Sequence, residues 1–200
     1  MATTASPYGL RPINRVDGMP YAGATETFLI DPAGEATNIF YGQVVIIGAD
    51  GYLAISTADG SDITTNNLGG NGVGAIGVFV GCEYVNAQGQ VIYSQYYPSG
   101  TTGVVTAKVI TDSNVAFQAQ LDGSGAQTVL GTNTFFAAVQ STSTGSTQTG
   151  NSTSALDATV QTTAAAFRIV GFASPAGDAY TDVLVKFNPS AHSYLNAVGL

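Results

Sequence analysis

The stretch Gly72-Val73-Gly74-Ala75-Ile76-Gly77-Val78-Phe79-Val80-Gly81-Cys82-Glu83-Tyr84-Val85 decides the fold class. Side chains alternate faces along a strand, so residues two apart share a face. The even positions form one unbroken apolar side: Ile76, Val78, Val80, Cys82 and Tyr84. The odd side holds Phe79 and Glu83. It also includes Gly77 and Gly81, where glycine permits sharp curvature or the close approach of another backbone. We therefore predict the central strand of a closed or strongly curved β-sheet.

The chain continues this strand patterning on both sides of the stretch, with turn signals about every 8–12 residues, a spacing typical of sandwiches and barrels. Residues 42–47 and 52–56 flank an Asp-Gly turn and are predicted to form a hairpin. Further strands are expected at 90–97, 104–110, 115–121, 135–139, 166–173 and 182–188, with 104–110 and 115–121 forming a second hairpin. The predicted class is all-β, a compact β-barrel or sandwich.

The chain divides into an N-terminal arm (1–27), a β-barrel or sandwich domain (28–188) and a C-terminal tail (189–200), which is an ordered surface segment or a second arm. Prolines and glycines in the arm forbid a helix or a regular central strand. We predict an extended arm with apolar anchors and no regular structure of its own, of the kind that lies across its own barrel or a neighbouring subunit. A loosely packed terminus is the alternative. The candidate contact residues are Pro7, Tyr8, Leu10, Arg11, Pro12, Ile13, Arg15 and Tyr21.

Three connecting segments carry expectations of their own. Residues 57–72 are polar and rich in glycine, which predicts a long exposed loop. Residues 141–154 are Ser/Thr-rich and contain no apolar side chain, so we expect an exposed or disordered loop. Residues 155–165 are compatible with one short helical turn.

The composition is poor in charge. Hydrophobic residues make up 44% of the chain and charged residues 9%, against about 25% in an ordinary soluble domain. We therefore expect copies of the protein or a partner to cover much of its surface. The formal net charge of −8, with five Lys and Arg residues, argues against nucleic acid and anionic membranes as partners.

The chain carries little that resembles a reactive site. Cys82 is the single cysteine and His192 the single histidine, so zinc is not expected and a Cys–His pair is a remote alternative. Asp59 and Asp62 lie in a glycine-containing loop that lacks the full calcium-binding pattern. We interpret Cys82 as a buried hydrophobe and the two aspartates as part of a solvated turn. No catalytic residue, cofactor or metal is expected.

The first residues do not show the pattern of an export signal. The first residues lack a basic region followed by an apolar run, and no apolar stretch reaches about 18 residues. We therefore expect no Sec export, no transmembrane helix and synthesis in the cytoplasm.

Three tyrosines lie close together in the sequence. Tyr93, Tyr96 and Tyr97 form a predicted aromatic cluster. We interpret it as core or interface, because tyrosine offers a large amphipathic contact, with sugar stacking as the alternative.

Several short motifs, in the same order along most of the chain, resemble proteins encoded next to the major capsid protein of tailed bacteriophages. They are residues 6–12 (SPYGLRP), 38–45 (NIFYGQVV), 77–84 (GVFVGCEY), 168–172 (RIVGF) and 185–188 (VKFN). These proteins are similar to capsid decoration, or cement, proteins. The resemblance implies a non-enzymatic, β-rich virion subunit on the outer surface of the expanded head, often a homotrimer, whose N-terminal segment touches the major capsid protein.

Two other classes remain open at this point. A head-fibre, tail or receptor-binding protein would share the β-rich composition, with the tyrosines contacting host glycan. A hydrolase built on a β-barrel would use paired carboxylates, although the chain has no tryptophan for a carbohydrate cleft.

Overall fold

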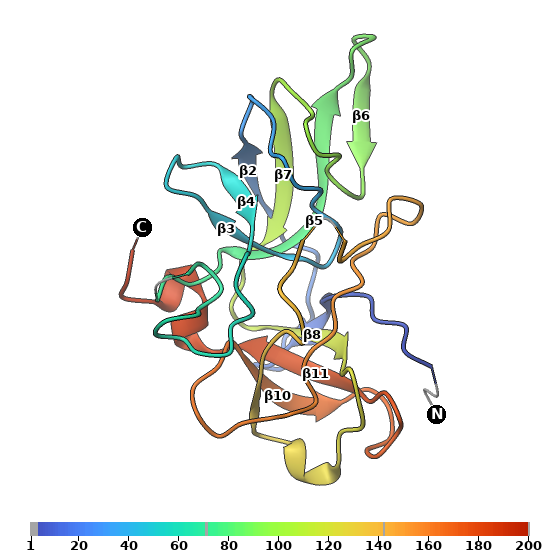
Figure 1. Ribbon diagram of the computed structural model, residues 1–200, viewed down its shortest axis with the longest axis vertical. Coiled ribbons are helices and arrows are strands. Elements are labelled where there is room, and N and C mark those ends of the chain that lie inside the picture. The colour runs from blue at the N-terminus through green and yellow to red at the C-terminus, as the bar shows by residue number, and fades with distance from the viewer. Residues whose placement is uncertain (1–3, 71, 142, 200) are drawn as a thin grey trace.

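The computed structural model describes residues 4–70, 72–141 and 143–199 and consists of two β-sheets packed as a sandwich (Figure 1). The all-β prediction is confirmed. The described strands are β1 (Arg11–Arg15), β2 (Glu26–Ile30), β3 (Val44–Ile47), β4 (Leu53–Ile55), β5 (Gly77–Val85), β6 (Val91–Ser94), β7 (Val105–Ile110), β8 (Val115–Gln120), β9 (Asn133–Thr134), β10 (Phe167–Phe172) and β11 (Asp182–Phe187). Short 3-10 turns are η1 (Gln127–Val129), η2 (Pro189–Ala191) and η3 (Ser193–Leu195).

The six-stranded sheet closes on itself. Its order is β3-β4-β2-β7-β5-β6, and β3 also pairs with β5, so five strands form a ring and β6 lies outside it on β5. The ring encloses one of the two hydrophobic clusters, in which Phe79, Val105 and Tyr97 are fully buried. Ring closure leaves β3, β4, β2 and β7 without a free edge, which removes sites for unwanted strand pairing.

The five-stranded sheet has the order β1-β8-β11-β10-β9 and occupies the lower part of Figure 1. Its β11 alternates cleanly, with Val183, Val185 and Phe187 buried as the sequence predicts. These side chains belong to the second hydrophobic cluster, which Val44 of β3 and Val78 of β5 enter from the other sheet. This shared cluster holds the two sheets together.

The central strand of the prediction is β5, which pairs with β3, β6 and β7. Its faces differ from the expected alternation, because a β-bulge shifts the register with β7 between Phe79 and Gly81. An extra residue in one strand reverses the facing of the residues after it. Val78 therefore enters the cluster between the sheets, whereas Phe79 and Cys82 both enter the ring. The expected unbroken even side is wrong.

Glycine in β5 does allow another backbone to approach closely. A Cβ placed on Gly77 would collide with the carbonyl oxygen of Ile110 in β7. Val78 and Ile110 are paired at this point, where the ring turns its corner. The predicted role of glycine as the residue that admits a neighbouring backbone is confirmed here.

The hairpin predictions have mixed outcomes. β3 and β4 pair antiparallel around a turn in which Gly51 has φ of +82°, as the Asp-Gly signal predicted. The second predicted hairpin is wrong, because β7 lies in the six-stranded sheet and β8 in the five-stranded sheet. The four residues 111–114 carry the chain from one sheet to the other. Residues 135–139 also form no strand; the nearby β9 is only Asn133–Thr134.

The polar segments pack more closely than expected. In the segment 57–72, Asn67 and Leu68 are fully buried, and Ser56 Oγ donates to Leu68 O at 2.5 Å. The prediction of a long exposed loop is wrong for much of the segment, because Leu68 enters the cluster between the sheets and Asn67 donates to Ser190 O. Thr57, Thr64 and Thr65 are exposed as predicted, and Asn71 lies outside the described residues. Residues 155–165 contain no helical turn in this part of the described chain.

Two buried amides, Gln43 and Gln140, anchor the Ser/Thr-rich segment 141–154 and its start. Within this segment, Thr142 lies outside the described residues. Gln43 Nε2 donates to Thr144 Oγ1 at 2.8 Å, and Gln140 Oε1 accepts from Val44 N at 2.9 Å. Ser152 and Ser154 are buried, so the expectation of an exposed or disordered loop is wrong for them. Thr147 to Thr149 are exposed, as expected.

Candidate interaction surfaces

The N-terminal arm lies along the protein's own five-stranded sheet. β1 pairs antiparallel with β8, so the prediction of an arm without regular structure is wrong for residues 11–15. Pro12 occurs on this edge strand, where a missing N–H is tolerated. A β-bulge between Pro12 and Asn14 interrupts the pairing at Ile13. The extended arm thus contributes an edge strand to the fold that carries it.

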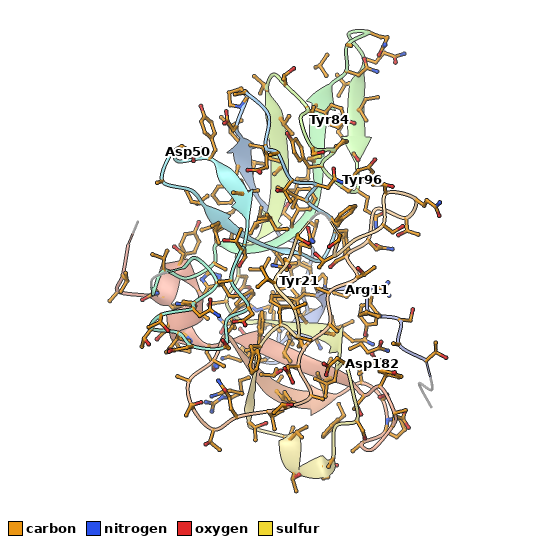
Figure 2. The ribbon with its side chains drawn as sticks, viewed as in Figure 1. Arg11, Tyr21, Asp50, Tyr84, Tyr96 and Asp182 are labelled. Atoms are coloured by element: carbon orange, nitrogen blue, oxygen red, sulfur yellow. The ribbon has the colours of Figure 1, made fainter. Side chains whose placement is uncertain are left out.

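The aromatic start of the arm is fixed by polar contacts. Tyr8 donates its hydroxyl to Asp182 Oδ1 at 3.0 Å, and the Arg11 guanidinium carbon lies 4.2 Å from the Tyr8 ring centroid. Figure 2 shows Arg11 and Asp182 on the same side of the molecule. Burial, followed by the charge of Asp182, raises the pKa of Tyr8. Tyr8 therefore stays protonated and acts as a donor.

The structure separates the eight predicted contact residues into internal and accessible ones. Leu10 is fully buried in the cluster between the sheets and belongs to the protein's own core. Its prediction as a contact residue for a partner is therefore wrong. Tyr21 packs partly against the same cluster. Arg15 is held by Asp17 at 2.6 Å and Asp112 at 2.7 Å. Pro7 and Pro12 are half-buried.

Arg11 and Ile13 are the exposed members of the predicted set, with Ile13 50% accessible. Two neighbours outside that set, Val16 and Met19, are 41% and 61% exposed. We call Ile13, Val16 and Met19 the arm residues. The sequence did not single out these two residues, because the segment after Pro12 shows no strand period that would place a side chain on a face.

A second accessible surface lies on the outside of β2, β7, β5 and β6. Cross-strand register aligns Leu29 with Thr106, Thr106 with Glu83, and Glu83 with Tyr93 in one row. The next row pairs Val85 with Val91, and Val104 lies beside them because Val105 pairs with Tyr84. We call this surface the outer face and define it by its exposed members: Leu29, Val85, Val91, Tyr93 and Val104.

The outer face is mainly apolar and has few charged residues beside it. Val104 and Tyr93 are 72% and 73% exposed, and the other three members are slightly more than half exposed. Glu83 and Lys108 lie among these side chains, with Lys108 Nζ 5.8 Å from the Tyr93 ring centroid. Asp31 follows β2 beside Val104, because Ile30 pairs with Val105 and Gly103 N donates to Pro32 O. An apolar face of this kind is typical of a contact surface. The sequence alone could not find it, because apolar side chains occupy both sides of β5 and only ring closure tells inside from outside.

The free edge of β6 borders the outer face. Within the described ranges, β6 pairs only with β5. Asn86 N donates to Gln90 O at the end of the β5–β6 hairpin. Hydrogen-bonded and non-hydrogen-bonded residue pairs alternate along an antiparallel ladder, so the backbone N–H and C=O groups of Val91 and Tyr93 point away from β5. The edge therefore presents unpaired backbone groups beside apolar side chains, which favours contact with an extended segment.

The predicted tyrosine cluster is not assembled. Tyr97 is fully buried inside the ring, and Tyr96 stacks on Phe40 with ring centroids 5.6 Å apart (Figure 2 shows Tyr96). Tyr93 alone stands on the outer face. The interpretation of these residues as core or interface is confirmed for Tyr97, and the platform of three rings required for sugar stacking is absent.

The reactive residue types occupy structural positions. Cys82 is 4% exposed inside the ring, its Sγ lies 3.5 Å from Tyr96 O, and burial raises its pKa to about 12. His192 instead packs against Phe187 of the cluster between the sheets. Asp59 and Asp62 accept hydrogen bonds within their own loop. No group of three or more potential metal-ligating residues occurs among the residues with described positions.

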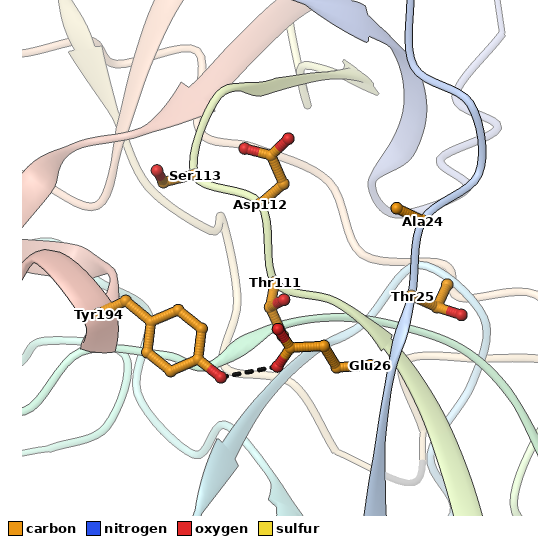
Figure 3. Close-up of a pocket in the computed structure, with 7 residues that line it drawn as sticks. All are labelled: Ala24, Thr25, Glu26, Thr111, Asp112, Ser113 and Tyr194. Atoms are coloured by element: carbon orange, nitrogen blue, oxygen red, sulfur yellow. Dashed lines mark hydrogen bonds between the residues drawn. The ribbon is translucent and has the colours of Figure 1, made fainter.

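A surface pocket of about 370 Å³ lies where β2 meets the connection after β7 (Figure 3). Tyr194 donates its hydroxyl to Glu26 Oε2 at 2.7 Å across it. Asp112, the second acid lining the pocket, pairs with Arg15. Both carboxylates thus have partners within the protein, and the hydrogen bond between Tyr194 and Glu26 joins the C-terminal tail to β2.

Comparison with protein-family models, curated proteins and solved structures gives no match to this chain. The helical segments that the structure describes are single 3-10 turns, none of them long enough to cross a bilayer. The candidate surfaces are therefore interpreted from their own geometry.

Proposed function

We propose that the protein is a structural virion subunit, a decoration or cement protein that binds the outer surface of a tailed-phage capsid and stabilises the expanded head. Its proposed partners are the major capsid protein and further copies of itself, as a homotrimer, and it has no enzymatic activity. The observation that carries the proposal is the outer face, an exposed apolar surface on a charge-poor chain. The motif resemblance supports the other part of the proposal, namely that the particle is the head of a tailed phage.

The size of the outer face sets what it can contribute. Fully burying a Val or Leu side chain contributes about 1.5–3 kcal/mol, so covering Leu29, Val85, Val91 and Val104 from their present exposure contributes about 3–7 kcal/mol. Association costs an estimated 4–15 kcal/mol or more in lost freedom. One outer face alone is therefore marginal, and stable attachment requires the arm residues and several subunits acting together.

Charge decides how the two surfaces are assigned. The chain carries −8 overall, whereas the outer face has only Asp31, Glu83 and Lys108 beside its apolar side chains, so repulsion between copies is weak at this face. We assign the outer face to contacts between copies. Arg11 and the arm residues are assigned to the major capsid protein, in agreement with the extended N-terminal segment of the resembling proteins.

Particle reconstitution tests the proposal. Capsids lacking the protein are mixed with the wild-type chain, with Val104→Lys, or with Ala87→Lys as a matched charge control on the nearby exposed turn. We expect the wild type and the control to bind and to raise the temperature of capsid disruption, and Val104→Lys to bind more weakly. Failure of the wild type to bind the capsid would refute the proposed function.

A head-fibre, tail or receptor-binding role is the second candidate, and Tyr93 is the observation that favours it. This ring is 73% exposed with Lys108 beside it, an arrangement that can contact a polar ligand. A glycan array with the wild type and Tyr93→Ala separates the candidates: loss of a specific glycan signal in the variant would support the receptor role over decoration.

A further inference from the structure

The C-terminal tail is attached to the beginning of the central strand. Ala75 N donates to Ala191 O at 2.8 Å, and Ser193 N donates to Ala75 O at 2.7 Å. Asn196 Nδ2 adds a bond to Gly72 O at 2.6 Å. Gly74 leaves no room for a side chain, because a Cβ there would lie 2.7 Å from the His192 carbonyl carbon. The tail therefore covers the segment immediately before β5.

His192 stands at the middle of this attachment and is 1% exposed. Its ring meets Phe187 and Tyr194 edge-on, each with ring centroids 5.6 Å away. Nδ1 accepts a hydrogen bond from Tyr194 N at 3.3 Å and thereby caps η3. Nε2 has no hydrogen-bond partner of ordinary geometry among the described residues. This environment suits a neutral imidazole that carries its proton on Nε2.

Protonation conflicts with these contacts. A second proton would sit on Nδ1, where the backbone N–H of Tyr194 already points, so the cap of η3 would be lost. The new charge would also be buried without an acid of the described chain in direct contact with it. Glu26 on β2 and Asp112 after β7 are the acids that act on the ring, and both attract the cation, as does the backbone of Thr111. Glu26, however, already accepts from Tyr194, and Asp112 pairs with Arg15. Burial outweighs their attraction and lowers the pKa of His192.

We propose that residues 189–199 form a latch on the segment before β5 that is closed by neutral His192 and released by acid. Release uncovers the Phe187 edge of the cluster between the sheets and the approach to β5, while both sheets stay folded. The latch is a property of the isolated chain and does not depend on the proposed virion role.

The direction of the pH dependence follows from linkage. In the released tail His192 has an ordinary pKa of about 6.5, and in the closed tail its pKa is lower, so the open state binds more protons between those values. The stabilisation of the closed state is complete above pH 6.5 and decreases as the pH falls below it. One proton linked to opening changes the opening constant by at most about tenfold for each pH unit.

Two measurements on the full chain test the latch. The chain has one histidine, so its NMR signals are assigned without ambiguity, and titration gives its pKa. Hydrogen exchange, corrected for intrinsic rates, follows the tail amides and those of β8 and β11 between pH 8 and pH 5. His192→Asn keeps a side-chain acceptor for Tyr194 N and removes the titration. Tyr194→Phe is the matched control, because it removes the bond to Glu26 and leaves the imidazole.

We expect the wild-type tail to lose protection below pH 6.5 while β8 and β11 keep theirs. Tyr194→Phe should lower tail protection at every pH and preserve the slope, and His192→Asn should remove the slope. A histidine pKa at or above 6.5 would overturn the proposal. So would a tail equally protected at pH 8 and pH 5, or loss of protection in tail and sheets together.

Discussion

Gly77→Ala is the substitution that most directly tests how the ring of strands closes. The alanine introduced there would place its Cβ against the carbonyl oxygen of Ile110, a main-chain atom in the β5–β7 ladder. A side chain could rotate away, but this oxygen can move only if the ladder shifts. Overpacking a core costs about 1–3 kcal/mol, and we expect the upper end, about 3 kcal/mol, because backbone must move.

Urea unfolding measures this cost, with the slope m reporting whether the native surface stays the same. With m of about 2–3 kcal/mol/M, a loss of about 3 kcal/mol lowers the midpoint by about 1 M at unchanged m. Gly171→Ala in β10 is the matched control, because its Cβ would meet only the Leu184 side chain, at 3.3 Å. A Gly77→Ala midpoint equal to that of the control would refute the tight approach of β7 to β5.

The remaining stability and reactivity predictions concern the core and the arm. Leu10→Ala should lower the free energy of unfolding by about 2–5 kcal/mol, whereas Ile13→Ala should change it by less than about 0.5 kcal/mol; equal urea midpoints for the two would contradict the burial of Leu10. Cys82 should resist a thiol reagent at pH 8 in the native protein and react fully in urea, because burial raises its pKa to about 12; rapid native labelling would show that the ring is open. Gln43→Ala should cost about 1–3 kcal/mol and increase proteolysis near Thr144, as checked by mass mapping of the fragments; an unchanged cleavage rate would disprove the anchoring of that segment.

Local patterns predicted the elements whose partners are close in sequence. The Asp-Gly turn fixed the β3–β4 hairpin, and the alternation of Val183, Val185 and Phe187 identified β11. Both depend on chemistry within a few residues, which a sequence displays directly. Pairing between distant strands leaves no such mark. The connection 111–114 has the length of a hairpin loop, yet it links two sheets, because β8 buries its side chains in the cluster between the sheets and β7 lines the ring.

The errors in the candidate site have the same origin. Leu10 looked like an anchor for a partner because the arm lacks a strand period, and only the fold shows that it enters the protein's own core. The bulge between Phe79 and Gly81 changes the facing of β5, so the outer face around Val85 and Val104 could not be separated from the interior. The polar segments were predicted to be exposed because their composition does not show that a buried amide such as Gln43 anchors them or that Gly145 packs against the Phe40 ring.

Cryo-electron microscopy of the parent particle, with the chain fitted into its density, tests the central claim most directly. The proposed function predicts this fold on the outside of the expanded head, with Ile13, Val16 and Met19 against the capsid protein. It also predicts that the outer face around Val104 is buried between copies. A head surface without the protein, or a bound subunit whose arm and outer face both point into solvent, would contradict it.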